Sequence, residues 1–277
     1  LDFLAVMNTR LMKGQKVLQG YLSAKNPVDT WVSGTFAIAF WTVNHLWHLG
    51  KYNLGLSSCL GGTGMCISAD IVREFGWGCD CLTEDMEFSM KCLSHGIRTC
   101  WVHDAIIYDE KPLTFMASWR QRKRWAQGQF DCSERYIPIL MKEGFKRHSI
   151  VVLDGIMQLL QNYFLLISAF YLVMTYINMF YPCFTGVLYN DALVPRQFWS
   201  VLGTIQYVLP LIVLLQIEVP AKIYLYWLIY PVFMYSWVPV TFLGWIHRHE
   251  KQWVHTIHTR SMQFQAASLT RKKEIDS

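Results

Sequence analysis

Residues 82–96, LTEDMEFSMKCLSHG, place two carboxylates directly before a stretch with helical periodicity. The apolar side chains of this stretch recur on one face of a helix: Met86, Met90, Leu93 and Ile97. Glu84 and Asp85 would then stand in the first turn, where unpaired N–H groups and the macrodipole favour negative charge. The two residues therefore have two explanations, an ordinary helix terminus or a catalytic carboxylate, and the rest of the chain must decide between them.

A second group of polar residues, QRKRW, spans residues 121–125. Gln121 and Arg124 lie three positions apart, so they share one helix face, with Trp125 beside them. Trp and Arg also occur in helices that lie at a membrane interface, where they act as anchors. Arg122 and Lys123, inside the same motif, are expected to supply positive potential for phosphate or for lipid headgroups.

Two further segments contain residues that could bind a ligand. The glycines of GGTG, Gly61, Gly62 and Gly64, would allow a ligand or a backbone to approach closely, although an ordinary turn explains them equally well. The stretch WVHTIHTR, residues 253–260, combines an aromatic ring with hydroxyl, imidazole and guanidinium groups. Its candidate binding residues are Trp253, Thr256, His258 and Arg260, and the alternative is a basic amphipathic stretch docked at a membrane.

The elements that must position these residues alternate between strands and helices. Helices are predicted at 2–13, 31–49, 69–75 and from Glu84 to Gly96, and strands at 16–22, near 61–68 and within 98–112. The segment 31–49 is long and apolar, but Ser, Gly, Asn and His residues interrupt it, so a buried or surface-lying helix is expected rather than a membrane span. This order indicates an α/β fold.

The composition changes near Ser149. The chain is 53% apolar with 16% charged residues, and residues 150–246 are almost free of charge. A Trp- and Arg-rich helix over 113–135 is expected to be amphipathic, and three apolar segments follow at 150–182, 198–217 and 223–246. Each is long enough to be considered as a span, although Pro231 and Pro239 suggest that the third is kinked, re-entrant or interfacial.

Charge and cysteine usage narrow the class of protein. Basic clusters flank the apolar region, as is typical of the cytoplasmic side of a membrane, while no nucleic-acid recognition motif accompanies the net charge of +5. The eight cysteines are scattered and do not form the two closely spaced pairs that are typical of a zinc site. Thiols in the core or in loops are therefore expected, and no residue is a predicted metal ligand. The chain opens with Leu1, which reads as a cut through a larger protein.

GGTG, TED, Q-x-x-R-W and WVHTIHTR occur in that order. Together they resemble the processive, membrane-embedded family-two glycosyltransferases, the group of cellulose, chitin and hyaluronan synthases. The resemblance implies a partial α/β domain of the GT-A type followed by an α-helical membrane region. It divides the chain into 1–111 (GT-A half), 112–149 (amphipathic interface helices), 150–246 (transmembrane helices) and 247–277 (a basic segment like a gating loop, and the tail).

The resemblance also implies roles for the motif residues. Asp85 would be the general base that takes the proton of the acceptor hydroxyl, with Glu84 in a supporting part. Arg124 would act at the diphosphate, Gln121 would be a further substrate-binding residue of the same motif, Trp125 would stack against an acceptor sugar, and the three glycines would line the acceptor side. In residues 253–260, Trp253, Thr256 and His258 take the places of Phe, Thr and Lys of the F-x-V-T-x-K gating loop of cellulose synthases, which is a departure from the pattern.

The implied activity is inverting transfer from a nucleotide-sugar, expected to be a UDP-sugar, to a growing polysaccharide at the cytoplasmic membrane face, with polymer export. Mg²⁺ or Mn²⁺ would be held by D-x-D carboxylates expected upstream of Leu1. Membrane lipids would be partners and nucleic acid would not. Two alternatives stay open: transfer of a single sugar to a lipid carrier, and a non-catalytic membrane protein.

Overall fold

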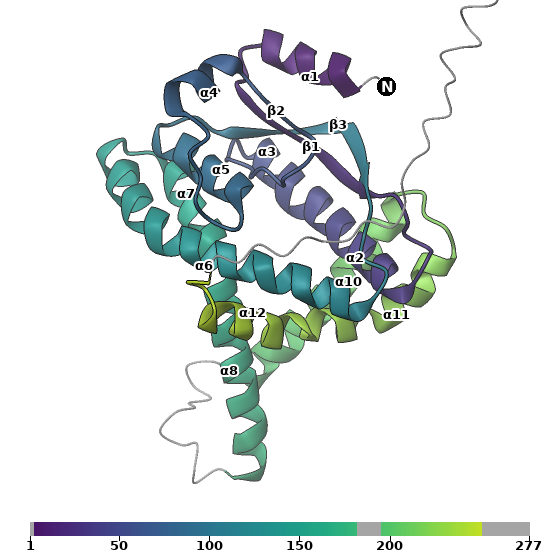
Figure 1. Ribbon diagram of the computed structural model, residues 1–277. Helices are drawn as coiled ribbons and strands as arrows, with labels where there is room; N and C mark the ends of the chain where they lie inside the picture. The colour runs from purple at the N-terminus through teal and green to yellow at the C-terminus, as the bar shows by residue number, and fades with distance from the viewer. Residues whose placement is uncertain (1–2, 182–194, 251–277) are drawn as a thin grey trace, which may run out of the picture.

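The computed structural model describes residues 3–181 and 195–250 and shows a small sheet enclosed by helices (Figure 1). The sheet has the order β2-β1-β3, with β1 at Val17–Ala24, β2 at Met65–Ile67 and β3 at Thr99–Asp109. Strand β1 is antiparallel to β2 and parallel to β3, and the β1–β3 register shifts between Gly20 and Tyr21. The α/β expectation is confirmed, although the protein is mostly helical.

Helices cover both faces of this sheet because neighbouring strand residues point in opposite directions. On the face of Val17, α4 (Ala69–Phe75) and α5 (Glu84–Ser94) pack through Ile71 and Phe88. On the face of Leu18, α1 (Phe3–Met12) packs through Met7. The start of α5, which carries the two carboxylates, is therefore held against the central strand by an apolar core.

The segment 31–49, predicted as a buried or surface-lying helix, is helical, and its first part is buried. It consists of α2 (Trp31–Thr42), a π-helical stretch η1 (Val43–His48) and the short α3 (Leu49–Asn53). Thr30 and Ser33 form a reciprocal capping box at the N-terminus of α2, so the first turn has its donors satisfied. Gly34 lies so close to the ring of Tyr226 that a side chain there would collide with it, which seats α2 inside the protein.

The helix with the Q-x-x-R-W motif is longer than expected. The sequence predicts a helix over 113–135, whereas α6 runs from Phe115 to Lys146 as one helix of 32 residues, with Pro138 inside it. It begins after Thr114, whose hydroxyl accepts the Ala117 N–H at 3.2 Å. Helices α5 and α7 (Ile150–Leu159) pack on it, and so does α12 (Trp237–Ile246). The region 112–149, expected to hold amphipathic interface helices, thus contains one long helix that contacts other helices on several sides.

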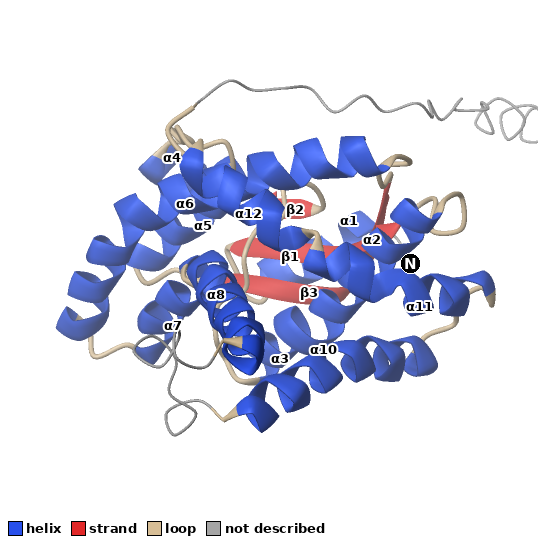
Figure 2. Ribbon diagram, turned by 90° about the horizontal axis from the view of Figure 1, so that it is seen from below, coloured by secondary structure: helices blue, strands red, loops and turns tan. Residues whose placement is uncertain are grey.

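The first apolar segment divides at Leu160. Helix α7 packs into the core around Leu140, Val152 and Leu159, whereas α8 (Gln161–Phe180) is buried only at Asn162 near its start, among its described side chains. The two helices are bent by 51°. Helix α8 projects away from the rest of the molecule in Figure 1 and is seen nearly end-on in Figure 2. The change from core helix to projecting helix, at Leu160, therefore lies beyond the composition boundary at Ser149, after the whole of α7.

The other apolar helices lie against the α/β part. Helices α10 (Arg196–Gln216) and α11 (Lys222–Tyr235) pack on α2, and α12 packs on α6. By length and composition, one stretch of the described residues could cross a membrane, Lys222–Ile246, or two if α7 and α8 form a single bent span. Of the three apolar segments considered as spans, the third therefore has the length and composition of a span, the first has them only as a bent pair, and the second does not, because the apolar part of α10 is short.

Candidate active site

Asp85 lies in the first turn of α5, where its side chain satisfies a backbone donor. Its Oδ1 atom accepts the N–H of Met86 at 2.7 Å, and its own carbonyl accepts the hydroxyl of Ser89 at 2.8 Å. Thr83 occupies the N-cap position, but its hydroxyl makes no capping hydrogen bond. Glu84 is exposed beside it. The helix-terminus explanation and the catalytic explanation for Asp85 are thus compatible.

Burial dominates the electrostatics of Asp85. Removal from water raises the pKa of its carboxyl to about 6, and the charge of Glu84 raises it further, while the N–H of Met86 and the cation of Arg124 act in the opposite direction. Such a carboxylate is ionised near neutrality and yet more basic than an ordinary Asp. A group of this kind can accept a proton from a substrate hydroxyl.

The glycine loop approaches this carboxyl at one position. A Cβ atom added at Gly62 would lie 3.3 Å from Asp85 Oδ2, and Gly62 has a φ of +74°. A Cβ at Gly61 or Gly64 would instead meet Leu22 or Ile107 at 2.8 Å. Of the three glycines, Gly62 therefore faces the candidate base, while the other two pack the loop against the sheet.

Several polar atoms of α6 and of the residue that caps α5 have no partner within the described part of the chain. Gln121 Oε1, Arg124 Nε and Thr83 Oγ1 are all buried and make no hydrogen bond there. Burying such atoms without partners is costly, so a native structure that retains them needs a reason. An oxygen-rich ligand between α5 and α6 would supply the missing acceptors for Arg124 and donors for Gln121.

Trp125 and Arg122 lie deeper than the sequence suggests. The ring of Trp125 packs in the apolar core against Phe36 and Phe40 of α2, with centroids 6.0 and 6.3 Å apart. Its stacking on an acceptor sugar stays a prediction. Arg122 is fully buried, its Cζ lies 4.5 Å from the centroid of the Phe233 ring, and it donates to Ser236 Oγ at 2.8 Å. The expectation that Arg122 meets phosphate or lipid headgroups is wrong.

One buried carboxylate in the same helix turn carries no role in the sequence interpretation. Glu87 accepts two backbone N–H groups of the preceding loop and pairs with Arg135 of α6. The signal was present in the sequence, because Glu87 precedes Met90 by three positions and so shares its buried face. A charged residue on a buried face requires a partner.

The remaining predictions concern the segment 253–260 and the divalent cation. Trp253, Thr256, His258 and Arg260 lie outside the described residues. Among the described residues, no three His, Cys, Asp or Glu side chains come together in a way that could hold a metal ion. These residues therefore do not fit the divalent cation that the resemblance implies, and no chemical step is assigned to it.

Comparisons with known proteins identify the family of the chain. Residues 2–244 match the sequence profile of the family described as "Glycosyl transferase family group 2". The protein named "Probable glycosyltransferase YdaM" from Bacillus subtilis (strain 168) is 30% identical over 80 residues. That match covers 28% of this chain and 19% of the relative's own length. Since the family profile extends over most of the chain, the protein belongs to glycosyl transferase family group 2.

Proposed function

We propose that this protein transfers a sugar from a nucleotide-sugar, expected to be a UDP-sugar, to an acceptor hydroxyl with inversion at the anomeric carbon. The observation that carries the proposal is the meeting of Asp85, Gly62 and Arg124 at one place. There, a half-buried carboxyl group faces a glycine of the loop and is acted on by the charge of a guanidinium. The family membership supports the class of reaction.

In the proposed reaction, each of these groups takes part in a single displacement. The acceptor oxygen attacks the anomeric carbon, its proton passes to the carboxylate of Asp85, and the bond from that carbon to the diphosphate oxygen breaks. Arg124, whose Nε has no partner in the described residues, would donate to the departing diphosphate. Gln121 has a free buried carbonyl oxygen that could accept from a sugar hydroxyl.

The acceptor and the setting are also part of the proposal. We propose a growing polysaccharide as acceptor and the cytoplasmic face of a membrane as the location, in a multi-pass protein with a role in polymer export. The projecting α8 supports a lipid environment, because large apolar side chains are exposed along it, among them Ile167, Phe170 and Val173. The order TED and Q-x-x-R-W supports an acceptor that is extended repeatedly. Mg²⁺ or Mn²⁺ would be bound by residues other than those described.

The test is turnover by the full-length protein in lipid with a panel of nucleotide-sugars, followed by sizing of the radiolabelled product. Long products would support repeated extension, a single sugar on a lipid would support the lipid-carrier alternative, and no turnover would favour a non-catalytic membrane protein. Asp85→Asn should abolish transfer and spare donor binding. Asp70→Asn, an exposed carboxylate on α4, is the matched control and should keep full activity. Retained turnover in Asp85→Asn would refute the base assignment.

A further inference from the structure

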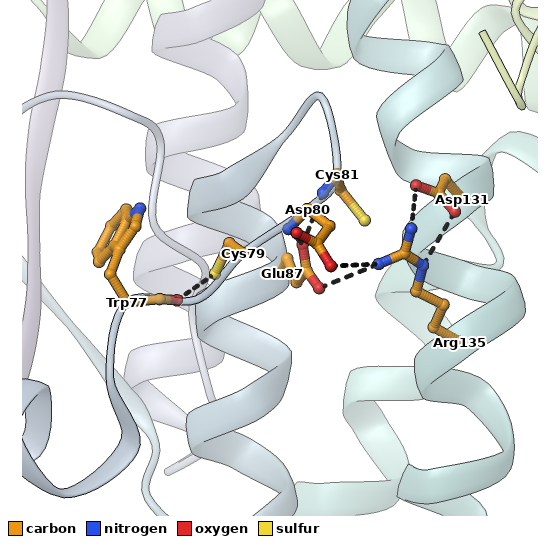
Figure 3. A network of polar contacts seen from close by, with 7 residues as sticks. All are labelled: Trp77, Cys79, Asp80, Cys81, Glu87, Asp131 and Arg135. Atoms are coloured by element: carbon orange, nitrogen blue, oxygen red, sulfur yellow. Dashed lines mark hydrogen bonds and ion pairs between the residues drawn. The ribbon is translucent and has the colours of Figure 1, made fainter. Parts of the chain in front are cut away.

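Glu87 is a buried carboxylate on α5, two residues after Asp85, with 4% of its surface exposed. Its Oε2 atom accepts the backbone N–H groups of Asp80 and Cys81 at 2.7 and 2.8 Å. Figure 3 shows this carboxylate between the loop that precedes α5 and the side chain of Arg135 on α6. Glu87 therefore fixes the loop that leads directly into the start of α5.

Arg135 is itself held in a defined orientation on α6. Its Nε and Nη2 atoms donate to the two carboxylate oxygens of Asp131, one turn earlier, at 3.0 and 2.9 Å. Its Nη1 lies 3.5 Å from Glu87 Oε1 and 3.9 Å from Asp80 Oδ2. A guanidinium bound on one side by two parallel hydrogen bonds has little freedom to turn, so its third nitrogen presents a fixed charge to α5.

A second junction between the same two helices lies at the site itself. A Cβ atom added at Gly128 of α6 would come within 2.5 Å of Thr83 Oγ1 and 2.7 Å of Thr83 N, so α6 and the backbone before α5 are in close contact there. Gly128 is one turn beyond Arg124. A contact at one point allows a helix to pivot, whereas two separated contacts fix its direction as well.

We propose that Glu87 is a positioning residue, which holds α5 against α6 through Arg135 and so places Asp85 opposite Arg124. The inference rests on the proposed function, in which these two residues act on the acceptor and the diphosphate. Without the Glu87 contact, α5 would be held to α6 by the close approach of Thr83 to Gly128 and by apolar packing further along both helices, neither of which fixes the loop before α5. Asp85 would then move relative to Arg124 without any change in either side chain.

The variant Glu87→Gln removes the charge and keeps the size. A glutamine has one acceptor oxygen and an NH₂ group, so it can face the two loop N–H groups or Arg135, but not both. A misplacement of about 1 Å can cost about 10²-fold in rate, so we expect kcat to fall by that order. KM for the donor should change little, because a loss confined to kcat reports an interaction made in the transition state.

The experiment compares kcat and KM of the full-length protein, with the active nucleotide-sugar, for wild type, Glu87→Gln, Arg135→Met and the double variant. If Glu87 and Arg135 act as one unit, the double variant loses no more than the worse single variant. Glu74→Gln, an exposed carboxylate on α4, is the control and should match wild type. A kcat of Glu87→Gln equal to wild type, or fully additive losses, would overturn the proposal.

Hydrogen exchange separates this inference from the proposed function, because it requires no turnover. In Glu87→Gln, the amides of residues 80–86 should exchange faster than in wild type, while those of α1 should not change. Unchanged exchange in 80–86 would overturn the positioning role even if the enzyme is active. Faster exchange together with a wild-type protein that turns over no nucleotide-sugar would confirm the contact and refute the catalytic role of the site, and with it the positioning role.

Discussion

Gly62 faces the carboxyl group of Asp85 so closely that an added Cβ atom would lie 3.3 Å from Oδ2. The backbone of Gly62 has a φ of +74°, a conformation that residues with a side chain rarely adopt. The glycine is therefore required twice, once for the turn and once for the space beside the candidate base. That space is where an acceptor hydroxyl would have to enter.

The variant Gly62→Ala separates these two requirements. We expect it to lose about 1–2 kcal/mol of stability from the left-handed backbone conformation, and to lose most of its transfer activity from the methyl group beside Asp85. Gly14→Ala is the matched control, since Gly14 has a φ of +84° and nothing within 4 Å of an added Cβ. Thermal unfolding should show similar losses in both, with activity lost only in Gly62→Ala. Equal activities would show that the space beside Asp85 is not used.

The pKa of Asp85 predicts the acidic limb of the pH profile. Because burial raises this pKa to about 6, kcat/KM should fall as the pH drops through about 6, where the base becomes protonated. The cation of Arg124 lowers the same pKa, so Arg124→Met should move the limb to higher pH. The measurement is kcat/KM from pH 5 to 8 at constant ionic strength. A limb near the ordinary Asp value of about 4 would contradict a buried base.

The same pKa predicts that Asp85 reduces stability. Folding favours the neutral carboxyl when its pKa is raised, so this favourable contribution is present below the unfolded pKa and is lost as the pH rises through about 6. Asp85→Asn should thus be more stable than wild type near neutrality, by at most about 3 kcal/mol. The difference in thermal midpoint should shrink as the pH is lowered toward 4. A less stable Asp85→Asn at neutral pH would argue against the desolvation of this carboxyl.

The sequence located the parts of the site that depend on local rules. The start of α5 is predicted from two carboxylates that precede apolar residues at helical spacing. Its end is predicted from Gly96, which has a φ of +83° in the structure. The buried nature of α2 follows from the polar residues that interrupt its apolar run. These features need only neighbours in the chain, so they can be read from a single sequence.

The features that the sequence did not predict depend on distant contacts. Arg122 is buried because Phe233 and Ser236, more than a hundred positions away, close over it. The division at Leu160 is hidden because α7 and α8 are both apolar, and the packing of Val152 and Leu159 against Leu140 of α6 distinguishes the core helix from the projecting one. The periodicity of a single sequence does not show which distant residue will pack over a given side chain and bury it.

The contact between α12 and α6 should be sensitive to a single methyl group. A Cβ atom at Gly244 would lie 2.5 Å from the Cβ of Ala126, so Gly244→Ala should destabilise the protein by about 1–3 kcal/mol through overpacking. Gly203 on α10 is the control, because nothing lies within 4 Å of its added Cβ, and Gly203→Ala should be neutral or slightly stabilising. Thermal unfolding in the same lipid measures both. Equal behaviour would mean that α12 is not seated on α6 at this point.

The exposed apolar surface of α8 predicts a difference between two identical substitutions. Val173, near the middle of α8, and Val72, on α4, are exposed by 52% and 37%. If α8 lies in lipid, Val173→Asp adds about 2.5–3.5 kcal/mol to the cost of insertion, whereas Val72→Asp places a charge in water at almost no cost. The fraction of protein retained in membranes after alkaline washing should fall for Val173→Asp and stay unchanged for Val72→Asp. Equal retention of the two variants would show that α8 is not in contact with the lipid interior, and would remove the main structural support for the membrane setting.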